Sequence, residues 1–312
     1  MQQIKTKRID YIDNLKAVLI FLVVFGHLLE SYINTSVEIK YIYILIYAFH
    51  IPFFAFASGY FSNKNISYKK IGKYILLYLF LQCIMAITHF ITNGFFDINW
   101  LISPSWMLWY LLSLACWWLL LKLIKNVKWY TIAIAFVIAL LTGFIPQIGE
   151  PFSISRTITI FPFFLIGVYL KQNPQPYIKI KSVIKYILPI TTVAILIVLY
   201  TQLEIISVTD FYYKLPYTFN FQVLYRFILF IVAILLSLQV AVLIPTKKNV
   251  LLSALGQQTL SIYILHKFAL ELLKSFTLTL NPYLIIIISL ITAFLLCYIF
   301  SRPKLNINYI LK

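Results

Sequence analysis

Long apolar runs separated by short polar breaks dominate the chain. Ten runs reach or approach the roughly 20 residues that an α-helix needs to cross a bilayer. They cover residues 13–31, 40–61, 71–92, 105–124, 129–145, 158–171, 183–201, 221–243, 257–275 and 282–301. Because a helix satisfies its own backbone hydrogen bonds in lipid, the pattern predicts an all-α, polytopic membrane protein with about ten transmembrane helices. The shortest run, 158–171, could instead be tilted or re-entrant.

The composition supports this fold class. Of the 312 residues, 62% are hydrophobic and 11% are charged, whereas a soluble domain has just under half apolar and roughly a quarter charged residues. Most breaks are too short to fold independently, and the two longer ones, 92–104 and 202–220, could cover a site. We therefore expect a single integral membrane domain over residues 1–312, without an extracytoplasmic soluble domain.

The charges indicate a topology. The chain has 26 Lys and Arg against 9 Asp and Glu, a net charge of +17. In a soluble protein this excess would indicate a nucleic-acid partner, but here most basic residues lie in short breaks between apolar runs. With a cytoplasmic N-terminus, every cytoplasmic break is basic, as the positive-inside rule requires. We expect an N-in, C-in protein of a plasma membrane, with no nucleic-acid partner. The abundance of Lys, Ile, Asn and Tyr is typical of an AT-rich genome and favours a bacterial inner membrane.

Two ionisable residues share one face of the first run. Lys16 and His27 are eleven residues apart, about three helical turns and roughly 16 Å along the axis. Ionisable groups at membrane depth are costly and usually functional. In the functional interpretation, Lys16 meets an anion from the cytoplasm and His27 removes a proton, because an imidazole titrates near neutral pH. In the structural alternative, Lys16 snorkels to the interface and His27 bonds a neighbouring helix.

Two more histidines fall inside predicted spans. His50 precedes Pro52 and Ser58-Gly59, which favour a kink and a close helix approach, and we interpret His50 mainly as a core residue. His266 follows Tyr263 by three residues, so the two side chains lie on nearly the same face. A hydrogen-bonded functional cluster and a structural His–Tyr pair are both open for these two residues.

Aromatic and basic residues gather near the expected membrane boundaries. Trp106, Trp109 and Tyr110 lie near the outer boundary, which is typical of an aromatic belt, and stacking on a sugar is the alternative. The inner boundary of the third run carries a basic cluster that attracts anionic lipid, formed by Lys69, Lys70 and Lys73.

Several motifs follow one another along the runs. A basic residue is followed after ten residues by a histidine, and the second run ends in the segment HIPFFAFASGY, which is similar to the pattern HxPxFFxxSGY. In order, the motifs occupy Lys16 to His27, His50 to Phe61, Lys69 to Lys73, Trp109 to Leu111, Phe163 to Gly167 and Leu255 to His266. The ordered set resembles the acyltransferase 3 family of integral membrane acyltransferases, especially its fucose-4-O-acetylase-like branch.

The resemblance implies transfer of an acyl group, most simply acetyl, from cytoplasmic acyl-CoA to a hydroxyl of an extracytoplasmic or lipid-linked glycan. Under this hypothesis His27 is the general base. The CoA phosphates would be held by Lys16, Lys69, Lys70 and Lys73, and the cavity would be lined by His50, Trp109, Tyr263 and His266. The sequence departs from the family in one respect, since Lys16 replaces the usual arginine and lacks its bidentate fork.

The expected partners are acyl-CoA, a glycan or lipid-linked glycan, and membrane lipid. Acetyl-CoA would be a co-substrate, without a permanently bound cofactor, and no oligomeric state is indicated. No disulfide framework or metal site is expected from the three cysteines, Cys83, Cys116 and Cys297.

Other interpretations stay open. An exporter or flippase of polysaccharide or lipid-linked sugar would suit ten spans, although the chain shows no internal repeat of the kind common in transporters. A structural or sensor protein would explain the topology but not three buried histidines. Direct transfer and a covalent acyl-histidine intermediate are both compatible with the sequence.

Overall fold

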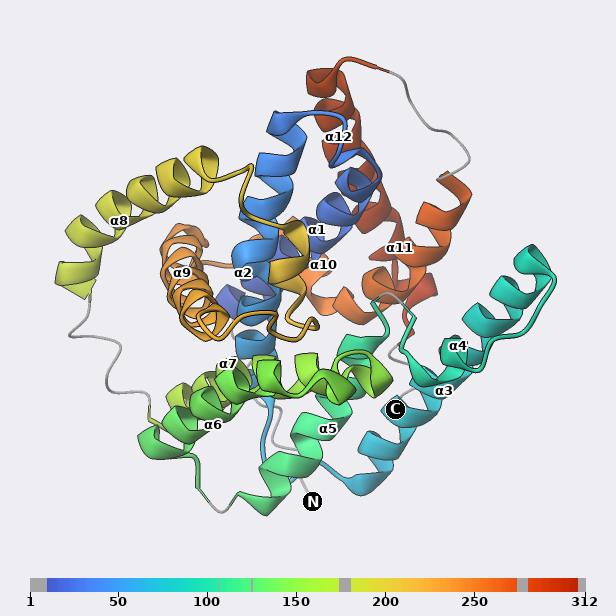
Figure 1. Ribbon diagram of the computed structural model, residues 1–312, viewed down its shortest axis with the longest axis horizontal. Helices are drawn as coiled ribbons and strands as arrows, with labels where there is room; N and C mark the ends of the chain where they lie inside the picture. Colours follow the sequence, from blue (N-terminus) through green and yellow to red (C-terminus); the bar gives the residue numbers. More distant parts are fainter. Residues whose placement is uncertain (1–9, 106, 125, 174–180, 274–279, 308–312) are drawn as a thin grey trace.

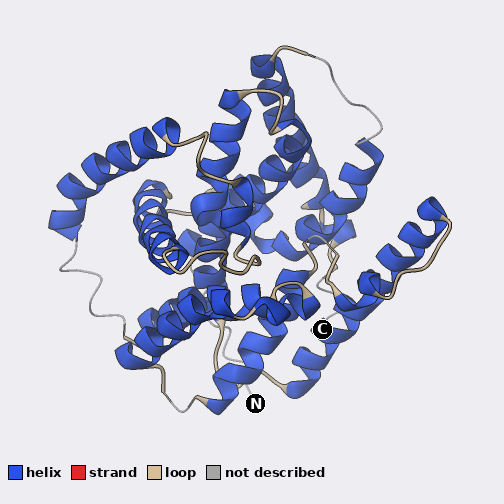
Figure 2. Ribbon diagram, viewed as in Figure 1, coloured by secondary structure: helices blue, strands red, loops and turns tan. Residues whose placement is uncertain are grey.

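A computed structural model describes residues 10–105, 107–124, 126–173, 181–273 and 280–307, so Trp106 lies outside the described residues. The described residues form helices and loops without a strand (Figure 2), which confirms the all-α fold class. The α-helices are α1 (Asp10–Leu29), α2 (Val37–Phe61), α3 (Tyr68–Asn93), α4 (Asn99–Ile102), α5 (Trp109–Leu123), α6 (Trp129–Leu141), α7 (Ile154–Gln172), α8 (Lys181–Thr201), α9 (Gln222–Leu243), α10 (Val250–Gln257), α11 (Thr259–Leu273) and α12 (Pro282–Phe300).

Polar side chains fix where several helices begin. The first turn of a helix leaves backbone N–H groups without an intrahelical partner. At the starts of α2, α3, α10 and α12, one of these N–H groups donates to the side chains of Ser36, Ser67, Asn249 and Asn281, respectively. These capping residues mark where a polar break ends and the next helix begins.

A helix lies on each of the ten apolar runs, but the helices differ in length. Among the described residues, six helices are long and apolar enough to cross a membrane: α1 with the turn after it, α2, α3, α7, α9 and α12. The apolar helices α5 and α6 and the apolar part of α8 are shorter. The chain is therefore a multi-pass membrane protein by its helices, while the number of ten spans and the N-in, C-in orientation stay predictions.

The helices α1 and α2 form the centre of the bundle. Both bury most of their apolar length, whereas α3, α9 and α12 expose most of theirs. In Figure 1, α8 lies at the periphery, and the most extensive neighbours of α2 and α1 are α7 and α10, respectively. Apolar side chains exposed on the outer helices suit contact with lipid.

Two glycines let α2 and α7 touch through their backbones. A Cβ on Gly59 would overlap the carbonyl oxygen of Phe164 and lie 2.8 Å from its carbonyl carbon. A Cβ on Gly167 would overlap the carbonyl oxygen of Phe56 in the same way. The close helix approach predicted at Ser58-Gly59 is confirmed, and it fixes the two helices that carry much of the candidate site.

The first turn of α1 is fixed to the C-terminal third of the chain. Gly256 in α10 packs on the backbone of Asp13, where a Cβ would lie 2.6 Å from the carbonyl carbon. The side-chain amide of Asn14 donates to the carbonyl oxygens of Pro245 and Lys247 at 2.8 and 2.9 Å. These contacts hold one end of the helix that carries the two residues predicted as the main site.

Candidate functional site

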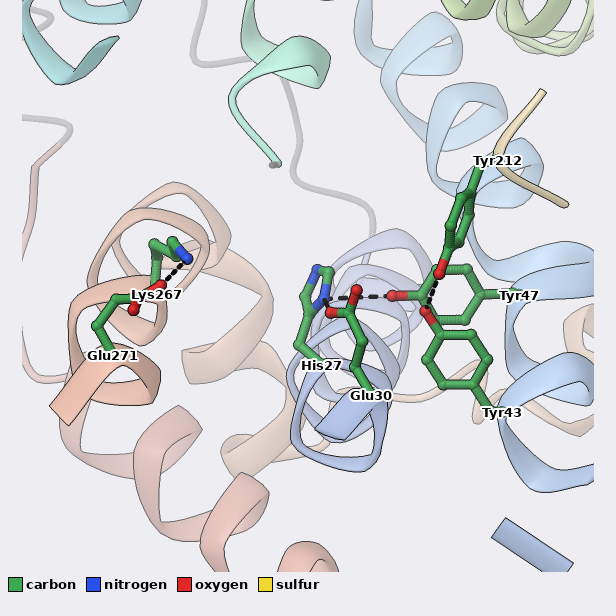
Figure 3. Close-up of polar contacts among 7 residues, drawn as sticks. All are labelled: His27, Glu30, Tyr43, Tyr47, Tyr212, Lys267 and Glu271. Carbon is green, nitrogen blue, oxygen red and sulfur yellow. Dashed lines mark hydrogen bonds and ion pairs between the residues drawn. The ribbon is translucent and has the colours of Figure 1, made fainter. Parts of the chain in front are cut away.

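His27 lies near the C-terminal end of α1, between a carboxylate and a tyrosine. Its Nδ1 is 3.2 Å from Oε2 of Glu30 and 3.2 Å from the hydroxyl of Tyr47 in α2 (Figure 3). The side chains of His27 and Glu30 are 12% and 28% exposed, so the pair is largely enclosed by protein. Their three-residue spacing brings them to one face.

The carboxylate decides which nitrogen of His27 carries the proton. An ionised carboxylate can only accept, so Nδ1 donates to Glu30 and the lone pair of the neutral ring lies on Nε2. A histidine oriented in this way can take a proton at Nε2. This geometry suits the predicted base, whose role stays a prediction.

The structure brings His50 and His266 to His27. The ring centres of His27 and His266 are 5.7 Å apart, with their planes at 23°. The ring of His50 lies 4.6 Å from that of Tyr47. In both neighbours Nδ1 lies 2.8 Å from the carbonyl oxygen four residues earlier in the same helix, to which it donates. In the described part of the chain, Nε2 of His266 is buried without a hydrogen bond, so a polar atom is available beside His27.

Tyr263 and His266 do not form the hydrogen bond that their spacing allows. Their ring centres are 6.4 Å apart, and the Tyr263 hydroxyl donates to the carbonyl of Met107. The two residues lie on nearly the same helix face, but each side chain forms its hydrogen bond with a backbone carbonyl instead. Tyr263 still lies beside the site, because its ring neighbours that of His266. On its other side, its ring is 6.4 Å from that of Tyr110. The hydroxyl of Tyr110 is 2.9 Å from Oγ of Ser58.

Tyrosines extend the site on the other side of His27. The rings of Tyr43 and Tyr47 are stacked with their centres 4.0 Å apart, and the hydroxyls of Tyr43 and Tyr212 are 2.8 Å apart. Tyr212 belongs to the break at 202–220, which therefore covers the site as its composition suggested. In Figure 3, the ion pair of Lys267 with Glu271 on α11 lies on the opposite side of His27 from these tyrosines.

Trp109 is buried and carries a cation on its ring. It is 8% exposed, and the guanidinium carbon of Arg156 in α7 lies 4.7 Å from its ring centre. The ring of Tyr110 lies 5.7 Å away. The belt interpretation of Trp109 is therefore wrong, because a second helix covers the indole that the sequence would leave facing the interface.

Two connecting segments are tied together beside Arg156. Ser155 donates to the carbonyl of Tyr213 at 3.0 Å. Lys214 and Glu150 form an ion pair at 2.8 Å, and the hydrogen bond and charge of Lys214 lower the pKa of Glu150. These contacts join the turn before α7 to the segment that carries Tyr212.

Backbone strain marks the same place. Phe152 and Ser153 adopt φ values of 49° and 51°, and Tyr213 adopts 54°. Residues other than glycine seldom occupy this left-handed region, and such strain gathers at functional sites. Phe152 and Ser153 lie four and three residues before Arg156, and Tyr213 directly follows Tyr212, so the strained residues fix where these two side chains enter the site.

Lys16 and Lys70 lie at the other end of the bundle, where α2 ends and α3 begins. The ammonium of Lys16 is 3.2 Å from Oδ1 of Asp13 and 4.9 Å from the ring centre of Phe61. The ammonium of Lys70 lies 5.3 Å from the ring centre of Trp118. Lys16 is therefore part of an ion pair, and His27 lies about three turns away along α1, roughly 16 Å.

Further lysines gather at this basic end. Lys69 is exposed and Lys73 is half-buried on α3. The ammonium groups of Lys122 and Lys171 donate to backbone carbonyls of the segment 62–64 at 3.4 and 3.1 Å. A hollow of about 560 Å³ opens nearby, lined by residues that include Lys64, Asn126, Lys128, Trp129, Tyr169 and Gln172. This end offers positive charge and space to an anionic ligand.

Some site residues were missed by sequence reasoning. Glu30 and Asp13 lie three residues from His27 and Lys16, so their spacing carried a signal. Tyr47, Tyr212 and Arg156 join the site only through packing between distant segments, for which one sequence gives no signal. Within the described ranges, no group of three His, Cys, Asp or Glu could hold a metal ion.

The chain was compared with known proteins. The model of the acyltransferase 3 family, described as an acyltransferase domain, matches residues 9–302. This match covers nearly the whole chain and does not distinguish the fucose-4-O-acetylase-like branch. No curated protein and no solved structure matches the chain.

Proposed function

The chain belongs to the acyltransferase 3 family, and from this premise we propose that it moves an acyl group, most simply acetyl, from cytoplasmic acyl-CoA to a hydroxyl of an extracytoplasmic or lipid-linked glycan. The observation that carries the proposal is His27, whose Nδ1 donates to Glu30 and lies 3.2 Å from the hydroxyl of Tyr47. A sugar hydroxyl becomes a useful nucleophile when a base removes its proton.

In the simplest route, Nε2 of His27 takes the proton of the acceptor hydroxyl while the hydroxyl oxygen attacks the thioester carbonyl. The tetrahedral intermediate collapses, the carbon–sulfur bond breaks, and the imidazolium returns the proton to the departing thiolate. The products are an ester and CoA, with no oxidant or metal required. In a second route the imidazole itself takes the acyl group, and mass spectrometry of the protein after exposure to acyl-CoA alone would detect that species.

The basic end supports a place for the CoA phosphates. Lys16, Lys69, Lys70 and Lys73 lie at or near it, and an ammonium binds phosphate through charge-assisted hydrogen bonds. The donor would enter from this end and place its thioester toward His27.

The proposal is tested with purified protein in detergent. We expect consumption of acetyl-CoA that depends on added glycan, and acylated surface glycans that disappear from cells lacking the protein. Movement of a glycan across a membrane without use of CoA would instead support the exporter or flippase alternative.

Loss of the Lys16 charge is expected to weaken donor binding. Lys16→Gln should raise the KM for acetyl-CoA about tenfold, because one charge-assisted hydrogen bond contributes roughly 1.5–3 kcal/mol. Lys16→Arg keeps both the charge and a partner for Asp13 and should stay near wild type. Lys248→Gln removes an exposed charge next to Lys247, whose carbonyl accepts from Asn14, and controls for net charge at the same end of α1. An unchanged KM in Lys16→Gln would remove Lys16 from the donor site.

Glu30→Gln is expected to lower kcat by about tenfold or more, because the amide no longer fixes the proton on Nδ1 of His27. The KM for acetyl-CoA should not change, since Glu30 lies far from the basic end. Glu38→Gln makes the same substitution at the start of α2, where Glu38 contacts Tyr283, and should have little effect. Equal kcat values for the two variants would exclude a positioning role for Glu30.

A further inference from the structure

Arg156 carries a guanidinium whose hydrogen-bonding capacity is only partly used. One terminal nitrogen donates to Oγ of Ser153 at 2.9 Å. Nε is buried without a hydrogen bond, and no ion pair with a carboxylate is found for Arg156 in the part of the chain that the structure describes. Arg156 is half-buried as a residue, but a donor atom that is shielded from water without a hydrogen bond is costly. Arg156 therefore needs an explanation beyond packing.

A second arginine of the neighbouring segments, the buried Arg226, has such an explanation. Arg226 in α9 donates to Oγ1 of Thr142 at 3.3 Å and to the carbonyl of Leu215 at 2.9 Å. Its guanidinium carbon also lies 4.5 Å from the ring centre of Tyr217. The hydrogen bonds of Arg226 thus stabilise the segment 202–220. By contrast, Nε of Arg156 is buried without a hydrogen bond and is available to a ligand.

The surroundings of Arg156 define what that ligand would be. One face of the guanidinium is covered by Trp109, while the hydroxyls of Tyr212 and Tyr263 and the carboxylate of Glu150 lie within electrostatic range of its charge. A planar guanidinium with donors along its edge fits the two oxygens of a carboxylate or phosphate. The carboxylate of Glu150 is already paired with Lys214, and an uncharged sugar hydroxyl would offer neither a charge nor a second oxygen to this edge.

The position of Arg156 places this anion away from the proposed binding site of the acyl donor. Arg156 and Trp109 lie in the first turns of α7 and α5, whereas Lys171 and Lys122 lie in the last turns of the same two helices. The proposed donor phosphates lie at the lysine end. An anion at Arg156 therefore belongs to another molecule on the side of His27, and the acceptor is the molecule that the reaction requires there.

We propose that Arg156 binds an oxyanion group of the acceptor, a carboxylate or a phosphate, and that the protein is selective for anionic sugars. This inference rests on the proposed function. Arg156 acts as a binding residue for the acceptor, and the strained turn at Phe152 and Ser153 holds it in place.

A binding experiment tests the inference without acyl-CoA. Purified protein in detergent is titrated with methyl glucuronide and with methyl glucoside, which differ in a carboxylate against a hydroxymethyl group, and tryptophan fluorescence is recorded. Glucose 6-phosphate serves as the phosphate probe. We expect the wild type to bind the anionic sugars at least about tenfold more tightly than the glucoside.

Matched variants assign the effect to one side chain. Arg156→Gln should abolish the preference, and Arg156→Lys, which keeps the charge but loses the fork, should retain part of it. Arg302→Gln is the control, because Arg302 also stacks on an aromatic ring, that of Tyr298 at 4.5 Å, and should keep the full preference. Equal binding of charged and neutral sugars by the wild type, or a preference that survives in both Arg156 variants, would overturn the inference.

Transfer assays separate this inference from the proposed function. If Arg156→Gln lowers transfer to glucosides and glucuronides equally, the residue does not select anionic acceptors and the inference fails while the enzyme assignment stands. If anionic sugars bind through Arg156 and no acyl transfer occurs with any acceptor, the anion site stands and the acyltransferase reaction fails.

Discussion

Replacing His27 by alanine is expected to lower kcat for acyl transfer by roughly a hundredfold to ten-thousandfold, the usual contribution of a positioned general base. The alanine side chain cannot take the proton of the acceptor hydroxyl, while the lysines at the basic end are untouched. Binding of acetyl-CoA should therefore stay close to wild type. The measurement is the rate of CoA release at saturating acetyl-CoA and acceptor.

His89→Ala is the matched control for this variant. His89 lies half-buried on α3, with its ring 5.4 Å from that of Trp100 and far along the chain from His27, and its loss should not affect transfer. Thermal unfolding of both variants in detergent shows whether the fold is intact. A folded His27→Ala protein with near-wild-type kcat would end the assignment of His27 as base.

Gly167→Ala is expected to destabilise the whole bundle, lowering the free energy of unfolding by about 3 kcal/mol through overpacking. The new Cβ would lie 2.7 Å from the backbone nitrogen of Tyr60 and overlap the carbonyl oxygen of Phe56. Backbone atoms cannot rotate away, so α2 and α7 must separate. The measurement is the unfolding transition in a denaturing-detergent titration, followed by tryptophan fluorescence.

The control for Gly167 is another helical glycine. Gly72 in α3 has no atom within 4 Å of an added Cβ. Gly72→Ala should leave stability unchanged or raise it by about 0.5–1 kcal/mol, because alanine is the better helix former. If both substitutions had the same effect on stability, backbone contact between α2 and α7 would not be what fixes their separation.

The helices were predictable because lipid imposes a long, uniform apolar pattern on each of them. The contact at Gly59 was predictable for a related reason, since a small residue in an apolar run signals a neighbouring backbone. Membership of the family was predictable from ordered motifs. The number of spans stays a prediction because α5, α6 and α11, with 15, 13 and 15 residues, are short for a full crossing, whereas the run 158–171 lies in a helix long enough to cross.

The site could be predicted only in part. Lys16 and His27 lie on one helix, so a helical repeat relates them. The neighbours of His27 come from α2, α11 and the segment before α9, and one sequence does not say which of its many tyrosines will meet. The belt interpretation of Trp109 failed for the same reason, since its burial depends on packing with distant segments such as that of Arg156, which lies 47 positions further along the chain.

The contact between Gly256 and Asp13 has a consequence for how the protein is made. The start of α1 emerges from the ribosome early, yet the groups that Asn14 and Asp13 bind or contact belong to residues 245–256. The helix that carries the proposed base therefore completes its packing only after residues 245–256 have been synthesised. Contacts of such sequence separation slow folding, so a chain that ends before residue 245 would lack the contacts that hold the first turn of α1.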